Sequence, residues 1–138
     1  MKTFEVIDIS GDAGIRAYGE TLQDLFVNAA TGMYSLITDP AAVREERHMA
    51  LDLESHSLEG LLVSWLNELI FHFDTYGFVG KTIRIATLRD NKISARVSGE
   101  EFDAERHEKR LLLKAATYHQ LSIERKEGRW VTNIIFDI

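Results

Sequence analysis

The apolar residues of two long segments recur three or four positions apart, a spacing that predicts amphipathic helices. The first segment runs from about residue 22 to residue 38. Thr21 is a good N-cap residue with Asp24 three positions on, and Asp39-Pro40 ends the helix because a residue before proline avoids helical backbone angles. The apolar positions are Leu22, Leu25, Phe26, Ala29, Met33, Tyr34 and Ile37.

The second helix has the most regular pattern in the chain. Ser57 is its expected cap and Gly77 its expected stop, so the helix has about five turns. A stripe this wide predicts that one whole face of the helix is buried. The residues of the stripe are Leu58, Leu61, Leu62, Trp65, Leu66, Leu69, Ile70 and Phe73.

Alternation of apolar and polar residues predicts β-strands in most of what remains. The glycine-rich turn at residues 10–14 and the turn at residues 126–128 each predict a hairpin, and Asp90-Asn91 marks a further tight turn. Residues 99–110 are polar and aperiodic, which predicts a long surface loop. The expected strands are residues 4–9, 15–18, 43–54, 83–85, 93–97, 121–123 and 130–136, with a short apolar run at 111–116.

Together these elements predict an α+β fold, in which two amphipathic helices pack on one largely antiparallel β-sheet. No repeat, low-complexity tract or linker divides the sequence, so residues 1–138 are expected to form a single domain. A chain of this length buries enough surface to need no metal or disulfide for its core.

Composition narrows the range of functions. The chain has no cysteine, which excludes disulfides, thiolate metal sites and a cysteine nucleophile. Its formal charge of −6 argues against broad contact with nucleic-acid phosphates. Neither a targeting signal nor an apolar run of about 18 residues is present, so a cytoplasmic protein without a membrane segment is expected.

Asp12 lies at the glycine-flanked tip of the first predicted hairpin. Aspartate is common in turns because its carboxylate accepts hydrogen bonds from nearby backbone N–H groups. On an open loop the same carboxylate is also a suitable ligand for Mg²⁺ or Ca²⁺, which prefer oxygen. Both interpretations are open from the sequence.

A second acidic position lies at the end of the chain, where Asp137 is followed by the α-carboxylate of Ile138. Two negative charges this close are either solvated or bridged by a cation. The apolar residues around them are expected to dock this end into the sheet and so to give the carboxylates a definite place.

Three further positions are candidates for chemistry. Lys114 interrupts an apolar run, either as a residue protecting a sheet edge or as a charge presented to a partner. His119 is as consistent with packing as with a base, and the loop around His107 is expected to be solvated with local ion pairs. The sequence has no phosphate-binding loop, dinucleotide fingerprint, HExxH or GxSxG motif.

The order of several short stretches resembles that of the archease family over essentially the whole chain. Each stretch is weak alone, and their agreement in order and length carries the resemblance. The matching stretches are Phe4, Glu5 and Asp8, then DAGIRAYG at 12–19, LQDLFVNAATGM at 22–33, LLVSWLNEL at 61–69, GEEFD at 99–103, RHE at 106–108, KAATYH at 114–119 and IFDI at 135–138.

The resemblance implies an α+β fold and an accessory function without catalytic residues of its own. Archeases assist the RtcB-type RNA ligase, which uses GTP and Mn²⁺, and they promote its guanylylation and multiple turnover in tRNA splicing and RNA repair. RNA would be contacted only indirectly. A divalent cation (Ca²⁺, Mg²⁺ or Mn²⁺) would be bound by Asp12, Asp137 and Ile138, while Lys114 and His119 would serve activation of the ligase.

One position departs from the family pattern. Archeases usually have Asp-His-Thr-Ala-Asp at the first turn, and here Ile9 takes the place of the histidine.

The alternative function is a chaperone-like module that protects nucleic-acid-processing enzymes from aggregation. A metal-dependent hydrolase is a third hypothesis, disfavoured because no nucleophile or general base accompanies the carboxylates.

Overall fold

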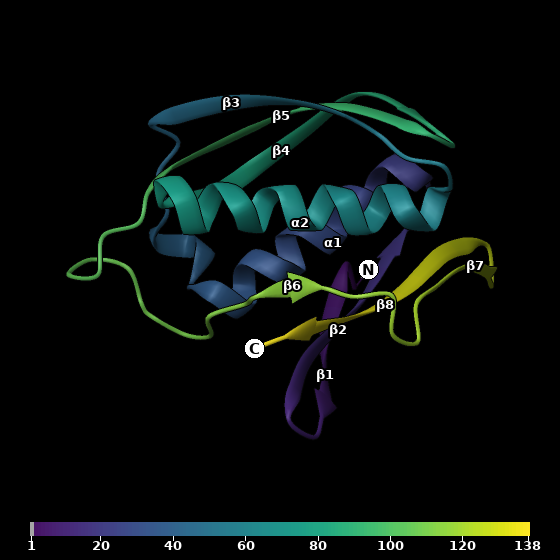
Figure 1. Cartoon of the computed structure of the whole chain (residues 1–138), viewed down its shortest axis with the longest axis horizontal. Coiled ribbons are helices and arrows are strands. Elements are labelled where there is room, and N and C mark those ends of the chain that lie inside the picture. Colours follow the sequence, from purple (N-terminus) through teal and green to yellow (C-terminus); the bar gives the residue numbers. More distant parts are fainter. Residues whose placement is uncertain (1) are drawn as a thin grey trace.

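The computed structural model describes residues 2–138 as two helices between two antiparallel sheets (Figure 1). The strands are β1 (Phe4–Ile9), β2 (Asp12–Gly19), β3 (Arg47–Glu54), β4 (Phe78–Arg89), β5 (Lys92–Glu101), β6 (Ala115–Ala116), β7 (Ser122–Lys126) and β8 (Arg129–Asp137). The helices are α1 (Leu22–Ile37) and α2 (Leu58–Tyr76), with a short 3-10 helix η1 (Pro40–Ala42).

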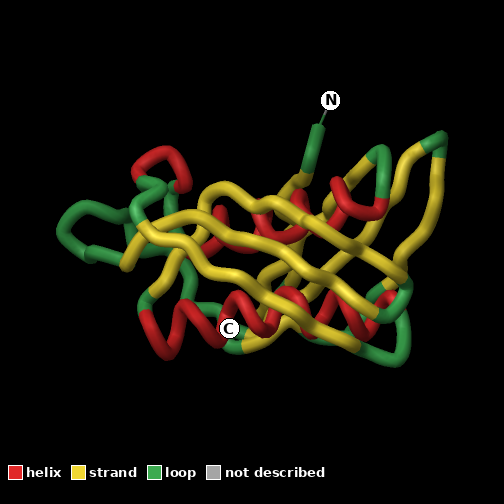
Figure 2. The backbone as a smooth tube through the Cα atoms, turned by 90° about the horizontal axis from the view of Figure 1, so that it is seen from above, coloured by secondary structure: helices red, strands yellow, loops and turns green. Residues whose placement is uncertain are grey.

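The α+β class, the two helices and both hairpins are confirmed, whereas the prediction of one sheet is wrong. Sheet A contains β1, β2, β8 and β6 in that order, with β7 also paired to β8, and sheet B has the order β3-β5-β4. Figure 2 shows the strands of sheet B crossing above the helices. One sheet covers each side of the helix pair. The buried apolar residues of each helix therefore extend beyond a single stripe.

The expected helix caps are present. The side chains of Thr21 and Ser57 accept hydrogen bonds from the backbone N–H groups of Asp24 and Gly60, at 3.1 and 2.9 Å. Gly77 adopts the left-handed conformation (φ 69°) that ends α2 and turns the chain directly into β4. Among residues 2–138, no helix is long and apolar enough to cross a membrane.

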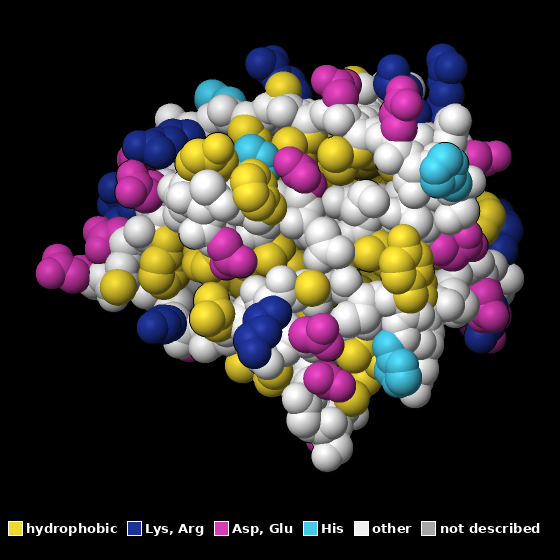
Figure 3. All heavy atoms as spheres, viewed as in Figure 1, with side chains coloured by type: hydrophobic (Ala, Val, Ile, Leu, Met, Phe, Trp, Pro, Cys, Tyr) yellow, Lys and Arg dark blue, Asp and Glu magenta, His cyan; other side chains and the backbone are white. Residues whose placement is uncertain are grey.

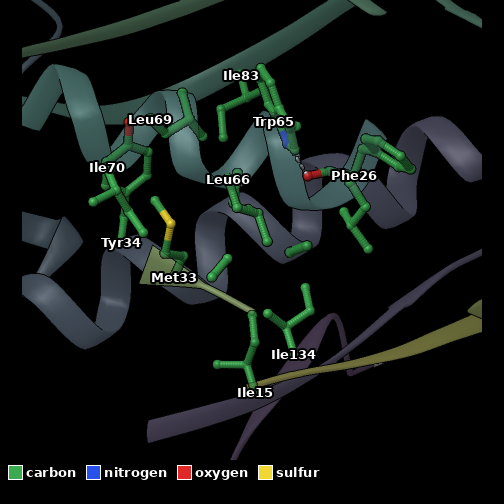
Figure 4. Close-up of a cluster of buried hydrophobic side chains, with 14 of the residues drawn as sticks. Ile15, Phe26, Met33, Tyr34, Trp65, Leu66, Leu69, Ile70, Ile83 and Ile134 are labelled. Carbon is green, nitrogen blue, oxygen red and sulfur yellow. Dashed lines mark hydrogen bonds between the residues drawn. The ribbon is translucent and has the colours of Figure 1, made fainter. Parts of the chain in front are cut away.

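The core lies between the two sheets, and Trp65 is one of its largest fully buried side chains (Figure 4). Ile83 of sheet B lies on one side of the helices, and Ile15 and Ile134 of sheet A lie on the other. The indole N–H of the fully buried Trp65 donates a hydrogen bond to the carbonyl of Phe26 at 3.1 Å. One side chain therefore joins α2 to α1 by packing and by a polar contact.

We expect Trp65→Phe to lower the free energy of unfolding by about 2 kcal/mol, because it removes this hydrogen bond and leaves unfilled volume in the core. Urea unfolding followed by far-UV circular dichroism measures the change. Trp130→Phe is the matched control, because Trp130, at the start of β8, is partly exposed whereas Trp65 is fully buried. Equal losses in the two variants would contradict a special contribution from Trp65.

Candidate functional site

The strand register brings the two acidic positions predicted from sequence to the same end of sheet A. The pairing of β2 with β8 ends at Ala13 opposite Phe136, and the next step of this register sets Asp12 opposite Asp137. Directly opposite residues of antiparallel strands have their side chains on one face. Since Ala13 and Phe136 are buried toward the helices, Asp12 and Asp137 belong to the outer, exposed face.

Lys114 reaches the same end of the sheet from a distant part of the sequence. Its backbone N–H donates to the carbonyl of Asp137 at 2.8 Å, and Ala115 pairs with Asp137 on β8. The Lys114 side chain is exposed, and its ammonium forms no ion pair within residues 2–138. Asp12 of β2, Asp137 of β8 and Lys114, directly before β6, thus lie at the same end of sheet A.

The short strand β6 is held in place by an asparagine of α2. The Asn67 carbonyl accepts from the backbone N–H of Ala116 at 2.7 Å, and its amide donates to the Ala116 carbonyl at 3.2 Å. The side chain therefore pairs with β6 as a neighbouring strand would. Helical periodicity gave no signal for this role, because Asn67 lies beside the apolar stripe and its partner is 49 positions away.

The other predicted residues have less defined surroundings. His119 lies on the exposed turn before β7, where its backbone N–H donates to the Thr117 hydroxyl at 3.2 Å. Ile9 pairs with Asp12 across the first hairpin, and its δ-carbon lies 3.1 Å from the position that a Cβ on Gly14 would take. An aliphatic side chain therefore occupies the position directly across the hairpin from Asp12.

The carboxylates of Asp12 and Asp137 are chemically suited to a hard cation, but side chains alone do not supply enough ligands for one. No group of three or more His, Cys, Asp or Glu side chains comes together in the described part of the chain. Asp12 and Asp137 offer two side-chain carboxylates, so any further oxygen ligand of a cation here would have to come from the main chain. Carboxylate and carbonyl oxygens are the ligands that Mg²⁺ and Ca²⁺ prefer.

The loop predicted at residues 99–110 is present after Glu101 and is largely exposed. The prediction is wrong in its start and in its full solvation, because the segment contains a buried ionic cluster. Strand β5 continues to Glu101, and Glu100 and His107 are only 4% and 3% exposed. The Glu100 carboxylate accepts from the guanidinium of Arg106, from the backbone N–H of Arg44 at 2.5 Å and from His107 Nε2 at 3.0 Å.

The hydrogen bonds also assign the protonation state of His107. Its Nδ1 accepts the backbone N–H of Asp103 at 2.8 Å, so the ring proton is on Nε2 and is donated to Glu100. Through these two hydrogen bonds the neutral imidazole holds the start of the loop, at Asp103, against the end of β5, at Glu100. Beyond it, Arg110 and Leu111 donate backbone hydrogen bonds to Ile37 and Leu36, so the chain is tied to α1 on its way to Lys114.

Acid is expected to destabilise the protein through Glu100. Burial alone raises the pKa of its carboxyl, but the hydrogen bonds from Arg106, Arg44 and His107 outweigh burial and bring the pKa to about 2, from an ordinary 4.5. A lowered pKa stabilises the fold above pH 4.5, and that contribution is lost as the pH falls toward 2. Thermal unfolding between these pH values measures it.

Glu100→Gln is the control for this pH dependence, because the carboxyl of Glu5 also has a pKa lowered to about 2. The stability gap between the natural protein and Glu100→Gln is expected to be widest above pH 4.5 and to close near pH 2. A gap that stays constant over this range would show that Glu100 does not titrate in it.

Comparison with known proteins finds one family. The model of the archease protein family (MTH1598/TM1083) matches residues 4–138. The protein archease of Saccharolobus islandicus (strain M.14.25 / Kamchatka #1) is 37% identical over 139 residues, and that of Sulfurisphaera tokodaii is 31% identical, each over the full length of both chains.

Two solved structures have the same fold. The solution structure of Methanobacterium thermoautotrophicum protein 1598 aligns over all of both chains with a TM-score of 0.78 and 36% identity. The crystal structure of a Thermotoga maritima archease, described as a possible chaperone, covers 96% of this chain and 94% of its own, with a TM-score of 0.68 and 16% identity. The second likeness concerns the fold alone.

Proposed function

The chain belongs to the archease family, and on that premise we propose that it is a metal-binding activator of an RtcB-type RNA ligase. It promotes GTP-dependent guanylylation of the ligase and its multiple turnover, acts in the cytoplasm by protein–protein contact, and has no catalytic cycle of its own. GTP and Mn²⁺ belong to the ligase, and RNA is met only through it. The meeting of Asp12, Asp137 and Lys114 at one end of sheet A supports this proposal.

A divalent cation is the proposed partner of the acidic positions. Asp12 and Asp137 belong to the same exposed face, and the α-carboxylate of Ile138 adds a third oxygen donor. Three carboxylates this close repel one another in the absence of a counter-charge, so a cation lowers the cost of holding them together. When bound, it fixes the end of β8 and with it the backbone hydrogen bond from Lys114 to Asp137.

Lys114 is the proposed contact with the ligase. An ammonium without an ion pair inside the described chain is free to meet a carboxylate or a phosphate oxygen on the partner. Its backbone is held from two sides, by β8 directly and by Asn67 through β6, so the charge projects from a fixed place. His119, on the exposed turn beyond β6, is the second proposed contact residue.

The proposal is tested by RNA ligation with a trace of the same organism's RtcB-type ligase, GTP and Mn²⁺. We expect about one turnover per ligase without this protein and many with it. Equal turnover in both reactions would reject the activator function and leave only family membership and fold. Guanylylation of the ligase, followed with radiolabelled GTP, shows whether this is the step that is accelerated.

A chaperone-like binding module is the second candidate. Several large apolar side chains are exposed, among them Phe71, Tyr76 and Leu112, and Figure 3 shows apolar side chains mixed with charged ones on the face over α2 and β6. The Thermotoga maritima archease is described as a possible chaperone. Suppression of ligase aggregation that is unaffected by EDTA and by Lys114→Ala would favour this candidate.

A further inference from the structure

The outer face of sheet A carries an ordered set of polar side chains away from the Asp12–Asp137 end. Glu5, Arg16, Asn133 and Ser122 stand opposite one another in one row across β1, β2, β8 and β7. Tyr18 belongs to the neighbouring row on the same face. Since this face is turned away from the helices, burial of the core does not require these side chains to be ordered.

A chain of hydrogen bonds fixes the row. The Glu5 carboxylate accepts from Lys2 at 2.9 Å and from the Tyr18 hydroxyl at 2.7 Å, and Arg16 lies 3.5 Å away. The bond from Lys2, followed by that from Tyr18, lowers the pKa of the Glu5 carboxyl to about 2. Glu5 is therefore charged at neutral pH, and its negative charge is already satisfied.

Asn133 and Arg16 hold each other in a defined orientation. Arg16 Nε donates to the Asn133 carbonyl oxygen at 2.8 Å. The amide nitrogen of Asn133 is consequently oriented as a donor, and it has no acceptor within residues 2–138. The row thus contains a preset donor, the Asn133 amide, beside the Arg16 guanidinium.

Arg129 completes the arrangement from the β7–β8 hairpin. Its guanidinium lies 4.0 Å from the centre of the Tyr18 ring, which is only 8% exposed. Apart from this cation–π contact, Arg129 makes no side-chain hydrogen bond or ion pair in the part of the chain that the structure describes. An arginine that is held over a ring, with its five N–H donors unused, is prepared to bind an oxyanion.

These residues border a cleft of about 350 Å³, within the range of small-molecule sites. Its charged lining consists of Arg16, Lys126 and Arg129 with Glu124 and Glu127, which leaves one net positive charge on a protein whose total charge is −6. Lys126 is already paired with Glu124 at 2.9 Å, and Arg16 lies 3.5 Å from Glu5. Within residues 2–138, Arg129 is therefore the cation of this lining that has no ion pair. A single positive charge matches a carboxylate better than a phosphate dianion.

We propose that this cleft is a carboxylate-binding site in which Arg129 forms paired hydrogen bonds with the ligand and the Asn133 amide adds a further donor. The ligand is a small organic acid, or the same group at the C-terminus of another protein. The site is separate from Asp12, Asp137 and Lys114, and its test does not depend on whether the proposed function is correct.

The test is NMR titration with N-acetylglycine at constant ionic strength, following arginine Nε–H and backbone amide signals. We expect saturable shifts at Arg129 and Asn133, and Arg129→Gln is expected to weaken binding about tenfold. Arg125→Gln is the matched control, because Arg125 lies over Trp130 at 5.5 Å on the opposite face of the same hairpin. It is expected to leave the affinity unchanged.

Shifts that grow linearly and equally with sodium chloride, or an unchanged affinity in Arg129→Gln, would overturn the proposal. Tighter binding of inorganic phosphate than of N-acetylglycine would overturn the assignment to a carboxylate. A short uncharged peptide with a free C-terminus separates the two sources. Binding as tight as that of N-acetylglycine supports a protein terminus, and exclusion of the peptide supports a small acid.

Discussion

Replacing Lys114 with alanine is expected to reduce ligation to about one turnover per ligase while the protein stays folded. The side chain is exposed, so its removal changes the free energy of unfolding by no more than about 0.5 kcal/mol. The backbone hydrogen bond from Lys114 to Asp137 does not involve the side chain and is kept. Only the charge offered to the ligase is lost.

Asp12→Asn and Asp137→Asn are expected to lose stimulation for a different reason. Each keeps its size but removes one of two carboxylates that the β2–β8 register sets opposite each other. Calorimetric titration with Ca²⁺, Mg²⁺ and Mn²⁺ is expected to show lost or weakened cation binding in these variants and normal binding in Lys114→Ala. This pattern distinguishes the cation from the ligase contact.

The matched controls are Asp90→Asn and Lys92→Ala, which lie at the turn between β4 and β5 in the other sheet. Both are expected to stimulate the ligase as the natural protein does. Normal stimulation by Asp12→Asn, Asp137→Asn and Lys114→Ala together would refute the assignment of these residues. Loss of stimulation in the controls as well would indicate a general effect of surface charge.

Glu100→Gln is expected to lower the free energy of unfolding by about 3 kcal/mol, one of the largest effects of any single change outside the apolar core. The variant removes the charge that neutralises Arg106 and leaves an amide N–H₂ facing other donors. Arg106 is partly exposed and gains some hydration, which keeps the loss below the upper end of the range for buried pairs. The midpoint of thermal unfolding is expected to fall by about 10 °C.

Glu101→Gln is the control at the next position. Glu101 is 61% exposed and pairs with Arg47 at 3.2 Å on the surface, where an ion pair contributes little. We expect a change of no more than about 0.5 kcal/mol. If Glu100→Gln and Glu101→Gln lower the free energy of unfolding equally, the buried cluster around Glu100 does not contribute more to stability than a surface ion pair does. Since the chain continues from it to Lys114, Glu100→Gln is also expected to weaken ligase stimulation.

Local patterns predicted the elements whose determinants lie close together in the sequence. The stripe around Trp65, the caps at Thr21 and Ser57, and the stop at Gly77 all depend on neighbours within a few turns, and the structure confirms each one. Asp12 was identified as a candidate from its turn, and Asp137 from its place beside the end of the chain. The sequence alone offered alternatives for both.

Local sequence patterns did not predict contacts between residues that are distant in the sequence. Polar residues at 99–110 looked like a solvated loop because a carboxylate is rarely buried without a partner. The partners of Glu100 are Arg44, on a distant segment, and Arg106 and His107, which face it only after the loop folds back. Asn67 likewise gained its role only when β6 came to lie against α2.

The sequence by itself therefore determined the helices, the hairpins, the α+β class and the chemical types of the candidate site residues, because side-chain periodicity and turn chemistry act locally. Tertiary structure alone decided that the strands divide into two sheets, that the register sets Asp12 opposite Asp137 with Lys114 alongside, and that Arg129 rests on Tyr18. These features depend on contacts between segments that are distant in the sequence, such as the pairing of Ala13 with Phe136, and such contacts leave no periodic trace along the chain.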